Sequence, residues 1–428
     1  MTKTMAVAAP NDAEPVSESL TGHRNTFRQI VARYQSLRCS LACRAGGLGQ
    51  SEDLAQETFV TAWRQLDNMA IRKNCARARQ HPFLTGLFSV AAGCCLVAGA
   101  TAETLYVDSN RGQDTNPGTV AQPLKTIEKA ALVANAKAEP EPLTIKLVAG
   151  IYALPTAVIF QSQHAFAKEQ RLTIEASVLP DDPNWNPGAM PVIFSVEDPR
   201  PAGQPGKHTE TYAMKIKMSH VTVRGLKFLG NPLPNNWHSP LECLATNLTD
   251  VEVTQCLFAG DPDTLDIYSA VITDGHQFVV DHCIFTGCHA CAVFWDGGRG
   301  VVGKANAMRY CIVDGAKISG VWTCDTDEDF EFHHNIVTRS EYFWLRKRGA
   351  PKTYRIHDSV VTGNKNYSGY GVETGATGPT GPEIRFDEER VVKAGNVALE
   401  QKRESKNYLH VVSGTPGSEL GAGLFLLQ

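Results

Sequence analysis

The sequence contains little charge and no apolar run long enough to identify a transmembrane helix. Charged residues make up 20% of its 428 residues and the formal net charge is −4, which argues against a disordered charged tail and against a protein that coats nucleic acid. The apolar stretch at about residues 83–99 is short for a transmembrane helix, which needs ~20 residues. Hydrophobic residues make up 43% of the chain, so it can bury one sizeable core or several, and its length allows about two or three domains.

The charge is distributed unevenly along the chain. Residues 1–102 carry 11 Lys and Arg against 7 Asp and Glu, a net charge of +4, whereas residues 103–428 carry a net charge of −8. We therefore expect the two parts to have different partners.

The boundary between these parts has the order of a secretory signal peptide. Basic residues at 72–79 precede the apolar stretch, and Ala100-Thr101-Ala102 follows it as an A-x-A cleavage site. We expect export to the periplasm, the cell surface or the medium, with Glu103 as the first mature residue. Retention as a membrane anchor and burial as a helix are the alternatives. Because Met69 lies directly before this segment, we expect residues 1–68 to be a gene fusion or the result of a wrongly assigned start codon.

The first 68 residues divide into two segments. Residues 1–20 have the composition of a disordered tail, and residues 21–68 show helical spacing, with Ser51 as an N-cap. Residues 51–66, SEDLAQETFVTAWRQL, resemble the polymerase-binding part of region 2 in extracytoplasmic-function sigma factors.

The resemblance to sigma factors covers only about residues 24–67. It implies contacts with the RNA polymerase core through Asp53, Gln56, Glu57 and Trp63 if the fragment is functional; the alternative is that Phe59 and Trp63 simply pack two helices together. The segments that read promoter DNA in that family do not follow, so no direct DNA reading is expected.

Residues 103–428 begin with a strand, a turn rich in Gly, Asn and Pro, and a short helix at residues 122–130. This opening resembles the N-terminal cap of secreted right-handed parallel β-helix proteins of the pectate-lyase-like superfamily. The resemblance implies an association with carbohydrate.

Internal repeats support a solenoid. Six segments align without gaps, and their last residues lie 30, 27, 28, 24 and 24 apart. They are residues 221–228, 251–258, 278–285, 306–313, 330–337 and 354–361. Each alternates apolar and polar residues like a half-buried strand, and second strands are expected at residues 270–272, 292–294, 320–322 and 342–344. The predicted fold is mainly β, a right-handed parallel β-helix with a small α-helical N-terminal segment. Loops at residues 231–240, 297–306 and 374–382 are expected to carry specificity.

The cysteines predict packing and not a disulfide framework, because only seven of the twelve follow residue 102 and an odd number cannot pair completely. Cys256, Cys283 and Cys311 share one repeat position, where we expect a buried stack. Cys288 and Cys291 form a CxxC motif without a second half at the spacing of a zinc site, which favours a structural role.

Two ladders of polar residues are candidate sites. The ends of the second strands carry Asp274, Asp296 and Asp325, with Arg346 or Lys347 on the next coil. Stacked carboxylates can supply the acid and base of a glycosidase, or hold Ca²⁺ for a lyase that acts on an acidic sugar. We predict Asp274 and Asp296 as the catalytic or metal-binding carboxylates and Arg346 as the anion contact. The fallback is an outward ladder that contains Asp281, His333 and His357; for either ladder the alternative is solvated surface.

Three functions follow from these observations. The first is an extracytoplasmic enzyme, a lyase or a hydrolase, that acts on a polysaccharide. The second is a β-helix that binds glycan or has a structural role at the cell surface. The third is transcription initiation through the N-terminal fragment. The motifs Asn-Thr-Asp, Gly-His-Gly and Arg-Ile-Lys of polygalacturonases are absent from the sequence, so no particular activity is implied. A monomer is expected.

Overall fold

The computed structural model describes residues 103–137, 141–162, 166–200, 207–261, 264–295, 302–323, 327–346, 352–372, 375–377 and 384–426. The chain divides into two units, residues 1–96 and 97–428, and every described residue belongs to the second. The predicted tail, sigma-like fragment and signal peptide lie outside the described residues. In the described ranges, no helix is long and apolar enough to cross a membrane.

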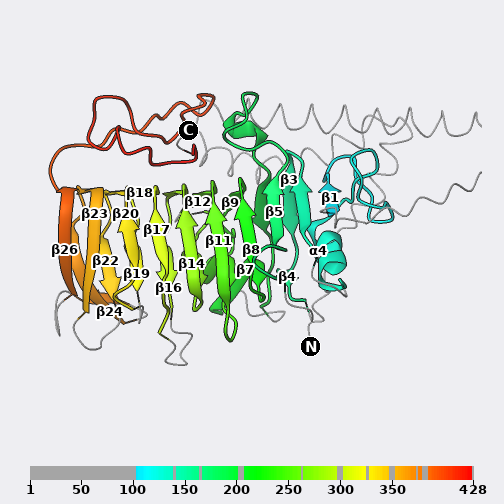
Figure 1. Ribbon diagram of the computed structural model, residues 1–428, viewed down its shortest axis with the longest axis horizontal. Coiled ribbons are helices and arrows are strands. Elements are labelled where there is room, and N and C mark those ends of the chain that lie inside the picture. Colours follow the sequence, from blue (N-terminus) through cyan, green and yellow to red (C-terminus); the bar gives the residue numbers. More distant parts are fainter. Residues whose placement is uncertain are drawn as a thin grey trace, which may run out of the picture. The chain divides into compact units, whose positions relative to one another are not determined.

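The described chain winds into a parallel β-helix with three ladders of strands (Figure 1). The first ladder is β1 (Glu103–Val107), β2 (Leu143–Leu147), β5 (Leu172–Ala176), β8 (Val221–Arg224), β11 (Thr249–Thr254), β14 (His276–Asp281), β17 (Ala307–Arg309), β20 (Glu331–His333), β23 (Lys352–Thr362) and β26 (Ile384–Val392). The second is β3 (Ile151–Leu154), β6 (Val192–Ser195), β9 (Lys227–Leu229), β12 (Leu257–Ala259), β15 (Ile284–Thr286), β18 (Ile312–Asp314), β21 (Ile336–Thr338) and the end of β23. The third is β4 (Val158–Phe160), β7 (Thr209–Ile216), β10 (Asn236–Cys243), β13 (Ser269–Thr273), β16 (Ala290–Phe294), β19 (Ser319–Thr323), β22 (Tyr342–Arg346) and β24 (Asn366–Val372), which pairs antiparallel with β25 (Gly375–Thr377).

The register of the repeats is confirmed at every predicted interval. Phe228 pairs with Phe258, Phe258 with Phe285, and Phe285 with Val313. The series continues to Val337 and Val361. The predicted second strands all fall within β13, β16, β19 and β22.

Five of the six repeats differ from the prediction in one respect: each forms two strands and not one, whereas residues 354–361 lie in the single strand β23. A residue with positive φ bends the chain between the first and second ladders, and this residue is Gln255 (φ 52°), His282 (φ 46°), Tyr310 (φ 51°) or His334 (φ 53°) in successive coils. Non-glycine residues adopt this left-handed conformation infrequently. Gln, His and Tyr all occur at the bend, so the sequence carries no constant signal for it.

The predicted loop at residues 231–240 is wrong in its second half, because β10 begins at Asn236. Gly230 and Asn231 instead lie close to the backbone of Leu265 and Asp266, and Asn231 N donates to Asp266 O over 3.2 Å. Residues 232–235 remain a turn between these contacts and the strand.

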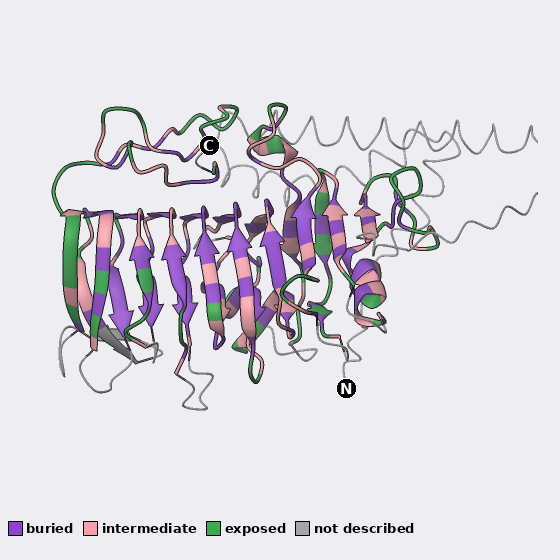
Figure 2. Cartoon of the chain, viewed as in Figure 1, coloured by how far each residue is buried: buried purple, intermediate pink, exposed green. Residues whose placement is uncertain are grey.

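The interior is built from stacks of identical side chains. The rings of Phe228, Phe258 and Phe285 lie 4.9 Å apart in nearly parallel planes. Cys256, Cys283 and Cys311 are fully buried beside them, which confirms the predicted cysteine stack. All six cysteines of the described ranges are free and buried, including Cys288 and Cys291. Figure 2 shows the buried residues running through the central strands.

Different elements cover the two ends of the solenoid. Helix α4 (Ile127–Asn135) packs its buried face at the first coils, and Thr126 caps it by accepting a hydrogen bond from Lys129 N. At the other end, β26 is mostly exposed (Figure 2). Its sequence IRFDEERVV places charged residues on the open edge, which discourages pairing with another chain.

The C-terminal segment, residues 397–425, packs lengthwise against the second ladder (Figure 1). We call it the C-terminal strap. Its residues Val397, Leu399, Leu409 and Leu424 cover an outward-facing row of aliphatic residues. That row is Leu257, Ile284, Ile312, Ile336 and Val360. The strap is anchored at its end, where Gln255 Nε2 donates to Leu424 O over 2.7 Å.

Candidate functional site

A hollow of about 240 Å³ lies on the outer face of the third ladder. Five consecutive coils contribute to it, from β7 to β19. Its lining residues are Glu210, Tyr212, Trp237, Ser239, Leu244, Tyr268, Ser269, Ile272, Val293, Trp295 and Trp322. Most binding sites for small organic ligands are concave and aromatic in this way, with few polar groups.

Two pairs of aromatic rings line the hollow. Trp237 stacks on Tyr268 with their ring centroids 4.9 Å apart and an interplanar angle of 17°. Trp295 and Trp322 meet edge to face with their ring centroids 6.1 Å apart. Trp237, Tyr268 and Trp295 are half-buried, whereas Trp322 is packed into the floor with Val293. The three half-buried rings are therefore partly accessible to solvent.

Three titratable residues precede the strands that form this floor. Asp266, His289 and Lys317 come shortly before β13, β16 and β19, respectively. None of the three lines the hollow itself, but the ring of His289 lies 5.9 Å from that of Tyr268, which does. His289 Nε2 is 3.2 Å from Asp266 Oδ1, but that buried oxygen has no hydrogen-bond partner among the described residues. His289 Nε2 and Asp266 Oδ1 are therefore close enough for an ion pair, but they do not form a hydrogen bond.

The environment shifts the pKa values of two of these groups in opposite directions. Burial raises the pKa of Asp266 to about 6, although the nearby Lys317 ammonium opposes the shift. Burial and then Lys317 lower the pKa of His289. Asp266 can thus hold a proton under weakly acidic conditions, and His289 is a neutral imidazole at pH 7.

A second carboxylate lies on the rim of the hollow. Glu210 on β7 accepts a hydrogen bond from Tyr212 Oη at 3.0 Å. By contrast, the buried Glu242 is compensated by Lys215 at 3.1 Å and by Lys217. Glu242 therefore stabilises the sheet face, and Glu210 is the carboxylate available to a ligand.

The structure describes two of the four predicted site residues, Asp274 and Arg346. Asp274 directly follows β13 and is buried, and its Oδ1 accepts a hydrogen bond from Ala245 N at 3.0 Å. Arg346 is the last residue of β22, three coils or ~14 Å further along the axis. It is only 1% exposed and pairs with the inward-facing Thr323, so it is not placed to contact a glycan on the outer face. Asp296 and Asp325 lie outside the described residues, and their role stays a prediction.

The predicted fallback ladder has formed as expected. Asp281, Arg309, His333 and His357 occupy one register position in successive coils. Arg309 Nε lies 3.3 Å from Asp281 Oδ1, and the ring of His333 stacks on that of His357 at 5.0 Å. Burial lowers the pKa of His333 to about 4, with help from the neighbouring His357.

Sequence reasoning missed the hollow because no motif connects its residues. They come from positions spread over residues 210–322. The available signal was an excess of Trp and Tyr near the starts and ends of the predicted second strands.

The fold places the chain among the parallel β-helix proteins. No family model and no curated protein matches the sequence. Solved structures with a similar course include a GH136 lacto-N-biosidase from Eubacterium ramulus, 11% identical over 87% of this chain and 80% of that one, with a TM-score of 0.40. A pectin methylesterase from Aspergillus niger is 13% identical over 76% and 95% of the two chains, with a TM-score of 0.41. A pectate lyase is 14% identical over 69% and 78%, with a TM-score of 0.27. At these values no activity transfers from them to this chain.

Proposed function

We propose that residues 103–428 bind and cleave a polysaccharide that lies in the hollow on the third ladder. The observation that carries this proposal is the combination of an open aromatic hollow with a neighbouring carboxyl group, Asp266, whose pKa is about 6. The hollow crosses four coil intervals, ~19 Å along the axis, which suits an extended chain ligand. Trp237 and Tyr268 supply the stacking surface for sugar rings.

Hydrolysis is the chemistry that this arrangement supports best. Glycosidases need one carboxylic acid to protonate the leaving oxygen and one carboxylate to activate water or attack the sugar. Protonated Asp266 takes the first role and Glu210 the second. They lie two coils apart, ~10 Å along the axis, slightly more than the separation of about 6.5–9.5 Å that leaves room for a water molecule in inverting enzymes.

Lyase cleavage of a uronate is the second candidate, and Lys317 beside His289 favours it. Lys317 would neutralise the sugar carboxylate, and the neutral imidazole of His289 would take the α-proton. With Lys317 in this place, Ca²⁺ is not required to neutralise the sugar carboxylate. If Ca²⁺ does bind, the predicted carboxylates Asp296 and Asp325 would be its ligands.

A depolymerisation screen on neutral polysaccharides and polyuronates tests the proposal. New reducing ends without ultraviolet-absorbing unsaturated products indicate hydrolysis, and both together indicate a lyase. Asp266→Asn should lower hydrolysis by about 10²–10⁴-fold while glycan binding persists, and Trp237→Ala should weaken binding. Asp314→Asn, at a surface ion pair with Arg339, is the matched control. Glycan binding without cleavage would favour the non-catalytic binder, and full activity of Asp266→Asn would refute the assignment.

We also propose that the solenoid acts outside the cytoplasm. Strand β1 begins at Glu103, directly after the predicted cleavage site, so removal of residues 1–102 would leave every described strand intact. The contact with RNA polymerase core and the monomeric state stay predictions.

A further inference from the structure

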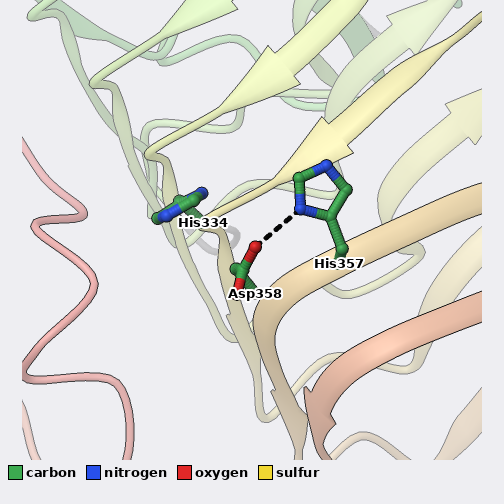
Figure 3. A group of neighbouring side chains, drawn as sticks. All are labelled: His334, His357 and Asp358. Atoms are coloured by element: carbon green, nitrogen blue, oxygen red, sulfur yellow. Dashed lines mark hydrogen bonds and ion pairs between the residues drawn. The ribbon is translucent and has the colours of Figure 1, made fainter.

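A group of metal-ligating side chains lies at the bend between the first and second ladders, away from the hollow (Figure 3). His334 and Asp358 occupy equivalent bend positions in consecutive coils, because the preceding residues His333 and His357 pair in register. Both have positive φ, 53° and 47°. The same conformation recurs at this bend in other coils, so it belongs to the architecture, and only the residue types distinguish this pair of coils.

The three side chains converge. His334, His357 and Asp358 each offer one ligand atom, and these atoms lie within 4.8 Å of one another. All three residues are half-buried, which leaves room for an ion to enter. In the part of the chain that the structure describes, this is the one such group of three or more His, Cys, Asp or Glu side chains.

Neighbouring groups hold the two imidazoles in place. His357 Nδ1 and Asp358 Oδ2 are 2.7 Å apart, so the imidazole and the carboxylate already face each other. Tyr310 stacks on His334 at 4.7 Å, and His333 stacks on His357 at 5.0 Å. Little side-chain freedom would therefore be lost when an ion binds.

We propose that His334, His357 and Asp358 form a binding site for a divalent first-row transition metal such as Zn²⁺. Two imidazole nitrogens and one carboxylate oxygen suit Zn²⁺, Ni²⁺ and Co²⁺. Ca²⁺ and Mg²⁺ prefer oxygen ligands alone, so they should not compete.

Arg390 is the competitor already present at the site. It forms ion pairs with both oxygens of Asp358, one of them at 2.8 Å. The carboxylate retains further lone pairs, and the Arg390 side chain is 62% exposed, so it can move toward solvent when the ion enters. Arg390→Gln should consequently tighten metal binding.

The chain contains a matched control with a single imidazole. His220 Nδ1 and Asp250 Oδ2 are also 2.7 Å apart, and Asp250 also pairs with an arginine, Arg171. This cluster does not reach three metal-ligating groups among the described residues. It reproduces the His–Asp–Arg arrangement without the second histidine.

The experiment measures Zn²⁺ bound per full-length chain by titration calorimetry and by metal analysis after dialysis. The first 102 residues contain other residues able to bind Zn²⁺, five cysteines and two histidines, so the decisive quantity is the difference between variants. The double variant His334→Gln/His357→Gln should bind one Zn²⁺ fewer than the parent. When Co²⁺ is loaded in place of Zn²⁺, the double variant should lack the visible absorption bands of this site. Asp358→Asn should weaken Zn²⁺ binding at this site because it removes the carboxylate ligand, and His220→Gln should bind as the parent does.

Circular dichroism and the melting temperature without metal verify that each variant is folded. Zn²⁺ should raise the melting temperature of the parent more than that of the double variant. Equal Zn²⁺ stoichiometry in the parent and the folded double variant would overturn the proposal, as would an equal loss in His220→Gln. The result is independent of glycan cleavage, because no residue of the hollow is changed.

Discussion

Replacing Cys283 by Asp and by Asn provides a quantitative test of the inner stack. Cys283 is fully buried, and its Sγ lies 3.2 Å from Asp281 O and 3.4 Å from Val253 O. Asp would place a carboxylate against these two carbonyl oxygens. Asn can instead donate to one of them, as Asn335 does two coils further on, where Nδ2 donates to Met308 O at 2.7 Å.

The free energy of unfolding should separate the two variants in a pH-dependent way. A carboxyl group buried without a donor takes up a proton and does not stay charged. Protonating a group with an ordinary pKa of about 3.9 costs about 4 kcal/mol at pH 7 and about 1.5 kcal/mol at pH 5. The folded pKa of the new Asp lies above its unfolded value, so the stability of the Asp variant relative to the Asn variant falls as the pH rises above about 4.

Urea unfolding of the parent and both variants at pH 5 and pH 7 measures this difference. Cys283→Asp should be less stable than Cys283→Asn at both pH values, and the gap should shrink at pH 5. Equal stability at pH 7 would show that the side chain at this position reaches solvent, and the inner register would then be wrong.

Three further predictions concern the strap, the hollow and processing. Ile312→Ala should cost about 2–5 kcal/mol and expose residues 397–425 to limited proteolysis, whereas Ala at the 66% exposed Ile151 should do neither. The rate of hydrolysis should fall as the pH rises through about 6, the pKa of Asp266. Lys317→Gln should move this decline to higher pH, because the substitution removes the cation that lowers the pKa of Asp266. A decline at the same pH in the variant would exclude Asp266 as the acid. N-terminal sequencing of exported protein should give Glu103, and a start upstream of Met69 would contradict cleavage.

The solenoid could be predicted because one side-chain alternation is repeated in every coil. Residues that end the repeats, such as Phe228 and Phe258, face the same interior and must stack, so periodicity alone fixes their register. The strap had a weaker signal, an aliphatic residue at the outward position of each repeat, as at Ile284 and Ile312. An outward aliphatic row needs a cover, but the row does not reveal which segment supplies it.

The candidate site could not be predicted in the same way, because a repeat determines which face a residue occupies but not the depth at which its side chain lies. The prediction of Asp274 and Arg346 rests on their positions at strand ends. Their burial depends on the turns around them: Asp274 accepts a hydrogen bond from the turn at Ala245, and Arg346 faces inward opposite Thr323. The raised pKa of Asp266 likewise follows from local burial, which composition does not record.

The outer faces of the first and third ladders differ in a way that favours the third as the site. On the first ladder, charged residues compensate one another between coils, as Asp281 and Arg309 do, so the ladder itself accounts for this pair. On the third ladder, Trp237 and Trp295 remain partly open to solvent, at the expense of hydrophobic burial. Asp266 beside them keeps a raised pKa although Lys317 is near. Neither feature stabilises the solenoid, and both are accounted for if a ligand occupies the hollow and takes its proton from Asp266.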